Sequence, residues 1–166
     1  MKIAIIGAGP AGLYLSYLVK RKQPRADERV FERNPPNATF GFGVVFSDRA
    51  LEFLRGDDPE TYDAITPAME SWSDITLDVE GSVISIDGGG FSAIGRLELL
   101  QLLQARTRAA GVEVKYEHAI NSLKEFPGAD LVVGADGVNS LVRRTYEKEF
   151  GASVDLLNNR FAWYGT

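Results

Sequence analysis

The order of apolar and polar residues along this 166-residue chain predicts a mixed α/β domain. The apolar run within residues 2–6 is typical of a short buried strand, and glycines end it. Residues 11–22 have the spacing of a helix, with Leu15, Leu18 and Val19 on one face, and Pro24 stops it. Residues 29–32 form a second predicted strand. A strand, turn, helix and strand within about 30 residues have the size of a βαβ unit.

The chain then leaves this parallel pattern and returns to it near its end. Residues 34–44 are rich in Pro, Asn and Gly, which predicts a loop. The further predicted elements are helices at 47–54 (capped by Ser47), 59–65 (capped by Asp58) and 96–110, a hairpin of strands 75–79 and 82–87, and strands at 112–116, 131–134, 153–157 and 160–164. The chain ends directly after a predicted strand, so we expect it to be truncated.

Composition narrows the function classes. The absence of cysteine excludes disulfides, thiolate metal sites and iron–sulfur clusters, and the single histidine, His118, excludes a multi-histidine metal site. The net charge of −5 argues against nucleic-acid binding. No apolar run reaches the roughly 20 residues that span a bilayer. We therefore expect a cytoplasmic protein with no membrane segment and no metal site.

A glycine triplet, Gly7-x-Gly9-x-x-Gly12, follows the first predicted strand and opens the first predicted helix. In this context the first glycine permits a tight turn, the second leaves room for a diphosphate, and the third lets helix and strand pack closely. The unpaired N–H groups of the helix start favour an anion. A plain glycine turn is the alternative interpretation.

Glu32 lies 20 residues after Gly12, at the end of the second predicted strand. A carboxylate at this place accepts hydrogen bonds from ribose hydroxyls and disfavours a 2′-phosphate. A solvated strand-end carboxylate is the alternative, and Arg33 beside it either contacts the adenosine or lies on the surface. These residues do not by themselves distinguish FAD from NAD.

Two further features point to the same kind of ligand. The run from Gly134 to Ser140, which contains Asp136 and Gly137 and is followed by Arg143, sits at the carboxyl end of a late strand, where ligands of open α/β sheets gather. Arg96 starts a leucine-rich helix, where a cation opposes the helix dipole and needs either an anion or solvent. A simple turn and a solvated arginine are the alternatives. No paired-carboxylate acid/base site stands out.

Taken together, these residues resemble the class A flavoprotein aromatic hydroxylases. The motifs that carry the resemblance are Gly7 to Gly12, Glu32-Arg33, the run from Thr39 to Asp48, Trp72 to Ile75, Phe91 to Arg96, and Gly134 to Arg143. They are most similar to the group of salicylyl-CoA 5-hydroxylase and 2-aminobenzoyl-CoA monooxygenase. That group usually has Gly-His-Gly where this chain has Gly88-Gly89-Gly90, and its later Gly-Asp motif is absent from this chain.

The resemblance implies a fold and a set of contacts. The fold is a Rossmann-type, glutathione-reductase-like, three-layer FAD-binding domain over residues 1–150, with an inserted β hairpin at about 72–92 and an incomplete substrate domain from 151 to 166. We expect residues 41–45 to pass near the isoalloxazine ring, because glycine allows close backbone approach. The implied cofactor-binding residues are Gly7, Gly9, Pro10, Ala11, Gly12, Glu32, Arg33, Gly43, Val44, Arg96, Ala119, Asp136 and Gly137.

The implied activity is hydroxylation of an aromatic substrate, such as an aryl-CoA thioester, by FAD, NAD(P)H and dioxygen through a flavin hydroperoxide. The cofactor carries the chemistry, so no protein side chain is expected to be catalytic. This stretch alone is expected to be inactive. The alternatives are an NAD(P)-dependent or flavin dehydrogenase or reductase without oxygen insertion, and a non-catalytic dinucleotide-binding module.

Overall fold

The computed structural model describes residues 1–160 and contains two compact units. Met1–Ala38 and the chain from Leu103 onward form the first unit, and Thr39–Leu102 forms the second. Helix α4 (Arg96–Ala109) begins in the second unit and ends in the first. No helix of residues 1–160 combines the length and the apolar character that a membrane crossing requires.

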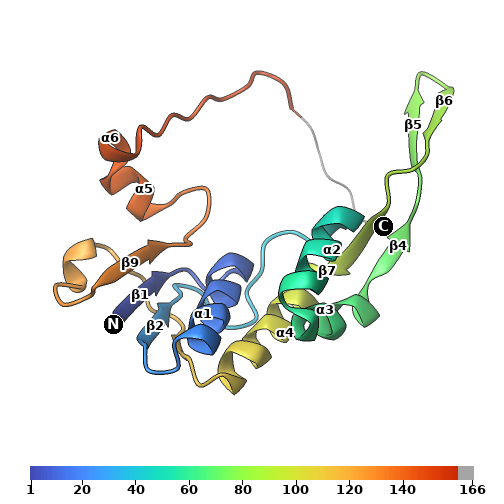
Figure 1. Ribbon diagram of the computed structural model, residues 1–166. Helices are drawn as coiled ribbons and strands as arrows, with labels where there is room; N and C mark the ends of the chain where they lie inside the picture. Colours follow the sequence, from blue (N-terminus) through green and yellow to red (C-terminus); the bar gives the residue numbers. More distant parts are fainter. Residues whose placement is uncertain (161–166) are drawn as a thin grey trace. The chain divides into compact units, whose positions relative to one another are not determined.

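The first unit is built on a four-stranded parallel sheet (Figure 1). Its order is β8-β2-β1-β9, in which β1 (Lys2–Ile6) lies between β2 (Asp27–Phe31) and β9 (Leu131–Gly134), and β8 (Glu113–Lys115) is at one edge. The helices of this unit, besides the end of α4, are α1 (Pro10–Lys22), α5 (Leu141–Thr145), α6 (Glu147–Phe150) and the 3₁₀ turn η2 (Leu123–Glu125).

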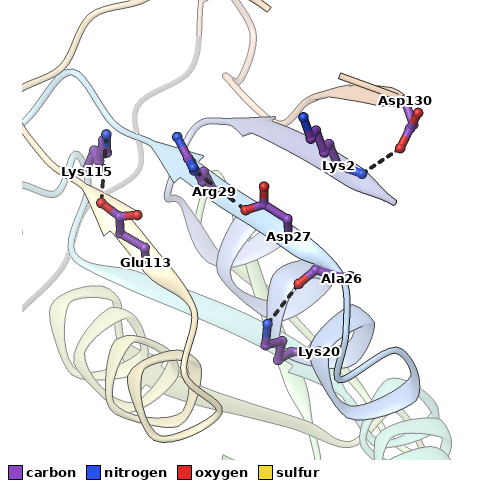
Figure 2. Close-up of polar contacts among 8 residues, drawn as sticks. All are labelled: Lys2, Lys20, Ala26, Asp27, Arg29, Glu113, Lys115 and Asp130. Atoms are coloured by element: carbon purple, nitrogen blue, oxygen red, sulfur yellow. Dashed lines mark hydrogen bonds and ion pairs between the residues drawn. The ribbon is translucent and has the colours of Figure 1, made fainter. Parts of the chain in front are cut away.

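The two faces of this sheet differ because side chains alternate along each strand. Ile5 and Val30 are fully buried on the side of α1, where Leu13 is also fully buried. The opposite side carries charges, and ion pairs join Arg29 to Asp27 and Lys115 to Glu113 along their strands (Figure 2). The main core of the unit therefore lies between the sheet and α1, while Phe31 on the opposite side packs against His118 and Phe126.

The buried face of α1 is not the one expected from its leucines. Gly12, Leu13, Ser16 and Tyr17 are buried, whereas Leu15, Leu18 and Val19 are only partly covered. The close approach at Gly12 selects this face, because a small residue lets the helix lie directly on the strand.

The second unit holds two antiparallel sheets. In the first, β7 (Phe91–Gly95) lies between β3 (Gly43–Ser47) and β4 (Glu70–Trp72). The second is the hairpin of β5 (Ile75–Val79) and β6 (Ser82–Ile86). Helices α2 (Asp48–Asp57) and α3 (Pro59–Ile65) and the 3₁₀ turn η1 (Thr66–Ala68) complete the unit, and Ser47 and Asp58 cap the two helices as predicted.

Most predicted elements are confirmed. Strands β3, β4 and β7 were not predicted. Val44, Val45 and Phe46 have high strand propensity, but the loop predicted up to residue 44 and the helix predicted from residue 47 left no strand between them. The predicted strand at 153–157 is wrong: these residues are irregular and have no ladder partner among residues 1–160, and Leu156 is 92% exposed. The predicted strand at 160–164 falls almost entirely outside the described residues.

Candidate functional site

Two glycines of the triplet are required by packing. Gly7 has a φ of +105°, and a Cβ atom there would overlap the carbonyl group of Ala135. A Cβ at Gly12 would overlap the carbonyl oxygen of Gly7. The turn after β1 thus lies directly against the turn after β9, which brings the first and the last sequence motifs together.

Gly9 is different. Its φ of −70° and ψ of 177° are open to any residue, and beyond its chain neighbours no heavy atom of residues 1–160 lies within 4 Å of the position of a Cβ atom. It is the N-cap of α1, and its carbonyl oxygen accepts a hydrogen bond from the N–H of Leu13 at 3.0 Å. Neither backbone strain nor packing explains a glycine here. The open space lies at the start of a 13-residue helix, where N–H groups face outward.

The carboxylate of Glu32 is held against the same loop. Its Oε2 accepts a hydrogen bond from the N–H of Ala8 at 2.9 Å, while its Oε1 accepts from the N–H and the Nδ2 of Asn34 at 2.9 and 2.7 Å. The backbone of Glu32 donates to the carbonyl of Lys115 and accepts from the N–H of His118, both at 2.8 Å. The structure therefore places an acid, partly buried, directly beside the glycine loop.

Asp136 follows β9 and supports the start of α5. Its Oδ2 accepts a hydrogen bond from the N–H of Leu141 at 2.6 Å, and its buried Oδ1 has no hydrogen-bond partner among residues 1–160. Gly137, next to it, has a φ of +79°. Asp136 and Gly137 thus form a turn between β9 and α5, as the alternative interpretation of this motif proposed. Within residues 1–160, the turn leaves one oxygen of the Asp136 carboxylate without a hydrogen-bond partner.

The other predicted residues of the first unit are placed as follows. Pro10 is the first residue of α1 and is partly buried, and Ala11 and Arg33 are exposed. Ala119 is exposed in the segment after β8. It follows His118, whose backbone N–H donates a hydrogen bond to the carbonyl of Glu32.

Gly43, Val44 and Arg96 belong to the second unit. Gly43 and Val44 lie in β3, opposite Gly95 and Ile94 of β7. The N–H of Arg96 donates to the carbonyl of Phe42 at 3.0 Å, and its side chain passes close to Gly41. The partly buried guanidinium of Arg96 makes no ion pair within residues 1–160.

The turn before β7 contains three glycines with unlike surroundings. Gly88 has a φ of +76°, and a Cβ at Gly90 would overlap the carboxylate of Asp48, whose N–H donates to the carbonyl of Gly90 at 3.1 Å. A Cβ at Gly89 would meet only the ring of Phe91, at 3.7 Å.

Sequence reasoning missed three residues near the glycine loop or its sheet. Asn34 was included in a loop but not recognised as the partner of Glu32. Burial raises the pKa of the Tyr116 phenol, an effect that the charge of Arg108 opposes and that of Glu32 reinforces. Burial also raises the pKa of Glu28 to about 7, against the opposing charge of Lys20. Glu28 stands between Asp27 and Arg29 in β2, so no pattern in the sequence marks it as the buried charge of the three.

A shallow groove of about 390 Å³ lies elsewhere in the first unit. It is lined by charged residues such as Lys2, Asp27 and Arg29 and by the segment from Glu125 to Ala129, and it includes no residue of the glycine loop.

Comparison with known proteins gives a consistent set of relatives, although no family model matches the chain. The chain is 42% identical over its whole length to a salicyloyl-CoA 5-hydroxylase from a Streptomyces species, of which it covers 32%. It is 31% identical to the protodeoxyviolaceinate monooxygenase of Chromobacterium violaceum, of which it covers 45%. A 3-hydroxy-4-methyl-anthranilyl-[aryl-carrier protein] 5-monooxygenase from Streptosporangium sibiricum is 28% identical over 99% of the chain and is covered to 46%.

Solved structures show the same fold. The structure of 2-methyl-3-hydroxypyridine-5-carboxylic acid oxygenase matches 84% of the chain with a TM-score of 0.70 and 24% identity, over 40% of its own length. PqsL of P. aeruginosa matches 97% of the chain with a TM-score of 0.69 and 18% identity, over 48% of its own length. The chain thus spans less than half of the proteins that it resembles.

Proposed function

Because the chain is homologous along its whole length to aromatic hydroxylases and monooxygenases, we propose that it is the FAD-binding part of an aromatic hydroxylase. The activity is proposed for the whole protein, since the chain covers only 32% of the salicyloyl-CoA 5-hydroxylase. By homology with that enzyme, the substrate is an aromatic ring carried as an acyl-CoA thioester.

The strand order supports a Rossmann-type domain. Numbered along the first unit alone, β1, β2, β8 and β9 are strands one to four, and their spatial order is 3-2-1-4. In open parallel sheets of this order a dinucleotide binds beyond the carboxyl ends of the strands, where the order reverses between strands one and four. The glycine loop and the turn at Ala135 and Asp136 occupy these two strand ends.

Gly9 is the observation that carries the proposal. The fold requires glycine at positions 7 and 12, but nothing in the described structure requires it at position 9. A diphosphate at the N-terminus of α1 would require it, because a side chain there would fill the space of the phosphates. The chemistry of the donors, outward N–H groups beside the Glu32 carboxylate, fits a diphosphate attached to a ribose.

The other residues of the predicted cofactor-binding set are divided between the two units. In the first, Pro10, Ala11, Arg33, Ala119, Asp136 and Gly137 adjoin the glycine loop or the segments bonded to it. In the second, Arg96 stands at a helix start, and Gly43 and Val44 lie in β3; their roles toward a cofactor are proposed from the sequence resemblance alone.

In the proposed reaction one oxygen atom of dioxygen enters the aromatic ring, the other leaves as water, and NAD(P)H supplies the two electrons. FAD, when bound, supplies the activation of dioxygen. The residues of this chain bind and orient: Glu32 holds the ribose, and the start of α1 holds the diphosphate. None of them is assigned a proton transfer.

Replacing Gly9 by valine tests this function in the intact protein. We expect the wild-type protein to show flavin absorbance and Gly9→Val to lose at least about 100-fold in FAD affinity, because the side chain occupies the diphosphate space. Its melting temperature should fall by no more than about 5 °C, the cost of losing glycine at the N-cap, since no heavy atom of residues 1–160 lies near the added group. The measurement is a fluorescence titration of the apoprotein with FAD.

Gly128→Val is the matched control, because Gly128 also has open space around its Cβ position. It should bind FAD as the wild type does. Retained FAD affinity in Gly9→Val would refute the site. A protein without flavin absorbance would favour a nicotinamide dehydrogenase, and a product without added oxygen would favour a flavin reductase.

A further inference from the structure

Asn34 makes an unusual pair of contacts with Glu32. Its backbone N–H and its Nδ2 both donate to Oε1 of Glu32, at 2.9 and 2.7 Å. The orientation of the amide follows from charge, because the alternative would place the Oδ1 oxygen of Asn34 against a carboxylate oxygen. Asn34 therefore occupies one whole side of the Glu32 carboxylate.

The backbone around Asn34 is fixed independently of this side chain. Its carbonyl oxygen accepts a hydrogen bond from the N–H of Glu117 at 3.2 Å, and Glu117 has a φ of +54° that aims this N–H. Two residues further on, the carbonyl of Pro36 accepts from Nε2 of Gln104 at 2.6 Å. A change of the Asn34 side chain should therefore leave the loop in place.

The hydrogen bonds of Glu32 limit what else it can bind. An ionised carboxylate has about four acceptor positions, two on each oxygen. Both positions on Oε1 are used by Asn34, and one position on Oε2 is used by Ala8. One acceptor position remains, on the oxygen that is bonded to the glycine loop.

From this arrangement we propose that Asn34 is a positioning residue that orients Glu32 so that the acid accepts a hydrogen bond from one ribose hydroxyl of the adenosine, and not from both. The proposal rests on the proposed FAD site. Asn34 does not touch the ribose in this scheme; it acts through Glu32.

The first test is a hydroxyl scan on the intact protein. The apoprotein is titrated with FAD and with two analogues whose adenosine ribose lacks the 2′- or the 3′-hydroxyl. We expect one analogue to bind about tenfold or more weaker than FAD and the other to bind within about threefold of it. Equal losses with both analogues, or no loss with either, would overturn the single-hydroxyl assignment.

The second test uses Asn34→Ala and the nearly isosteric Asn34→Asp, which both remove the side-chain donor. Each should weaken FAD binding by about tenfold or more, Asn34→Asp the more because its charge repels Glu32. With the analogue that lacks the bound hydroxyl, the effect of Asn34→Ala should shrink to less than about threefold. A merely structural role would weaken FAD and this analogue alike, and that outcome would refute the positioning role.

Asn37→Asp is the control, because Asn37 is exposed in the same loop and undergoes the same change of charge. It should bind FAD within about twofold of wild type, and circular dichroism should show all variants folded. Wild-type protein that binds no FAD would defeat the proposed function itself. If the wild-type protein binds FAD and the Asn34 variants bind it with the same affinity, only the proposed role of Asn34 is refuted.

Discussion

The parallel sheet of the first unit and the β5–β6 hairpin of the second differ in how their apolar residues are covered. In the parallel sheet, Ile5 and Val30 are fully buried. In the hairpin, Leu77 and Ile84 face each other on one side, yet Ile84 is 51% exposed and Val83, on the other side, is 68% exposed. Nothing within residues 1–160 buries the hairpin, and two strands alone are marginally stable in water.

This contrast separates the parts that are packed by contacts within residues 1–160 from the hairpin, which is not. The glycine loop, Glu32 and Asn34 are held by contacts within the first unit. The hairpin buries few of its apolar side chains within residues 1–160, so it gains little stability from apolar burial there. Three substitutions test this contrast.

Gly12→Ala should have the largest effect, because its methyl group would overlap the carbonyl oxygen of Gly7. Helix and strand must separate, which we expect to lower the free energy of unfolding by at least about 4 kcal/mol. Urea unfolding followed by circular dichroism measures this, and Gly9→Ala is the matched control because it adds the same group to open space. Equal stability of the two variants would contradict the packing described for the glycine loop.

Glu28→Gln should have the next largest effect, and it should depend on pH. The buried carboxyl of Glu28 has a pKa of about 7 in the folded chain against an ordinary 4.5, and neither oxygen has a hydrogen-bond partner among the described residues. Below pH 4.5 both states are protonated and no penalty exists. As the pH rises to 7 the unfolded chain ionises first, so Glu28 destabilises the fold, by at most about 3 kcal/mol above pH 7.

The variant, which cannot ionise, should therefore exceed wild type in stability at pH 8 and lose this advantage at pH 4.5. Unfolding in urea at the two pH values measures the difference. An advantage that is the same at both pH values would show that folding does not raise the pKa of Glu28.

Ile84→Thr should have the smallest effect. Threonine has a strand propensity similar to that of isoleucine, and the exposed side chain loses little buried area. We therefore expect the free energy of unfolding to change by no more than about 0.5 kcal/mol. Val30→Thr is the matched change in the parallel sheet and should cost about 2 kcal/mol, because it buries a hydroxyl. A loss near 2 kcal/mol for Ile84→Thr as well would show that the hairpin is covered in solution and would remove the contrast.

The sequence was most informative where local chemistry decides the structure. A run of apolar residues, the glycine triplet and the acid 20 residues later were enough to predict β1, α1, β2 and the closeness of Glu32 to the glycine loop. Ser47 and Asp58 correctly predicted the starts of α2 and α3, because an N-cap acts on backbone groups only a few residues away. The roles of Gly43, Val44 and Arg96 toward a cofactor stay predictions.

The sequence was least informative where distant segments decide. Strand β3 has strand-forming residues, but its partner β7 lies about 50 residues later, and no local pattern indicates that pairing. Residues 153–157 have strand-forming side chains but no partner in the described chain, and they stay irregular. The hydrogen bonds of Asn34 to Glu32 depend on the exact path of the loop, which no residue pattern specifies.

The turn of Gly88, Gly89 and Gly90 shows how a sequence departure can leave a backbone unchanged. Gly88 is favoured by its left-handed conformation, and a side chain at Gly90 would have to displace the exposed Asp48 carboxylate, whereas the middle position has room for a side chain against Phe91. The Gly-His-Gly pattern of the resembling hydroxylases would thus fit here with no rearrangement of the main chain. This chain and a histidine-bearing relative can share one loop shape and still offer different surfaces to whatever that loop meets.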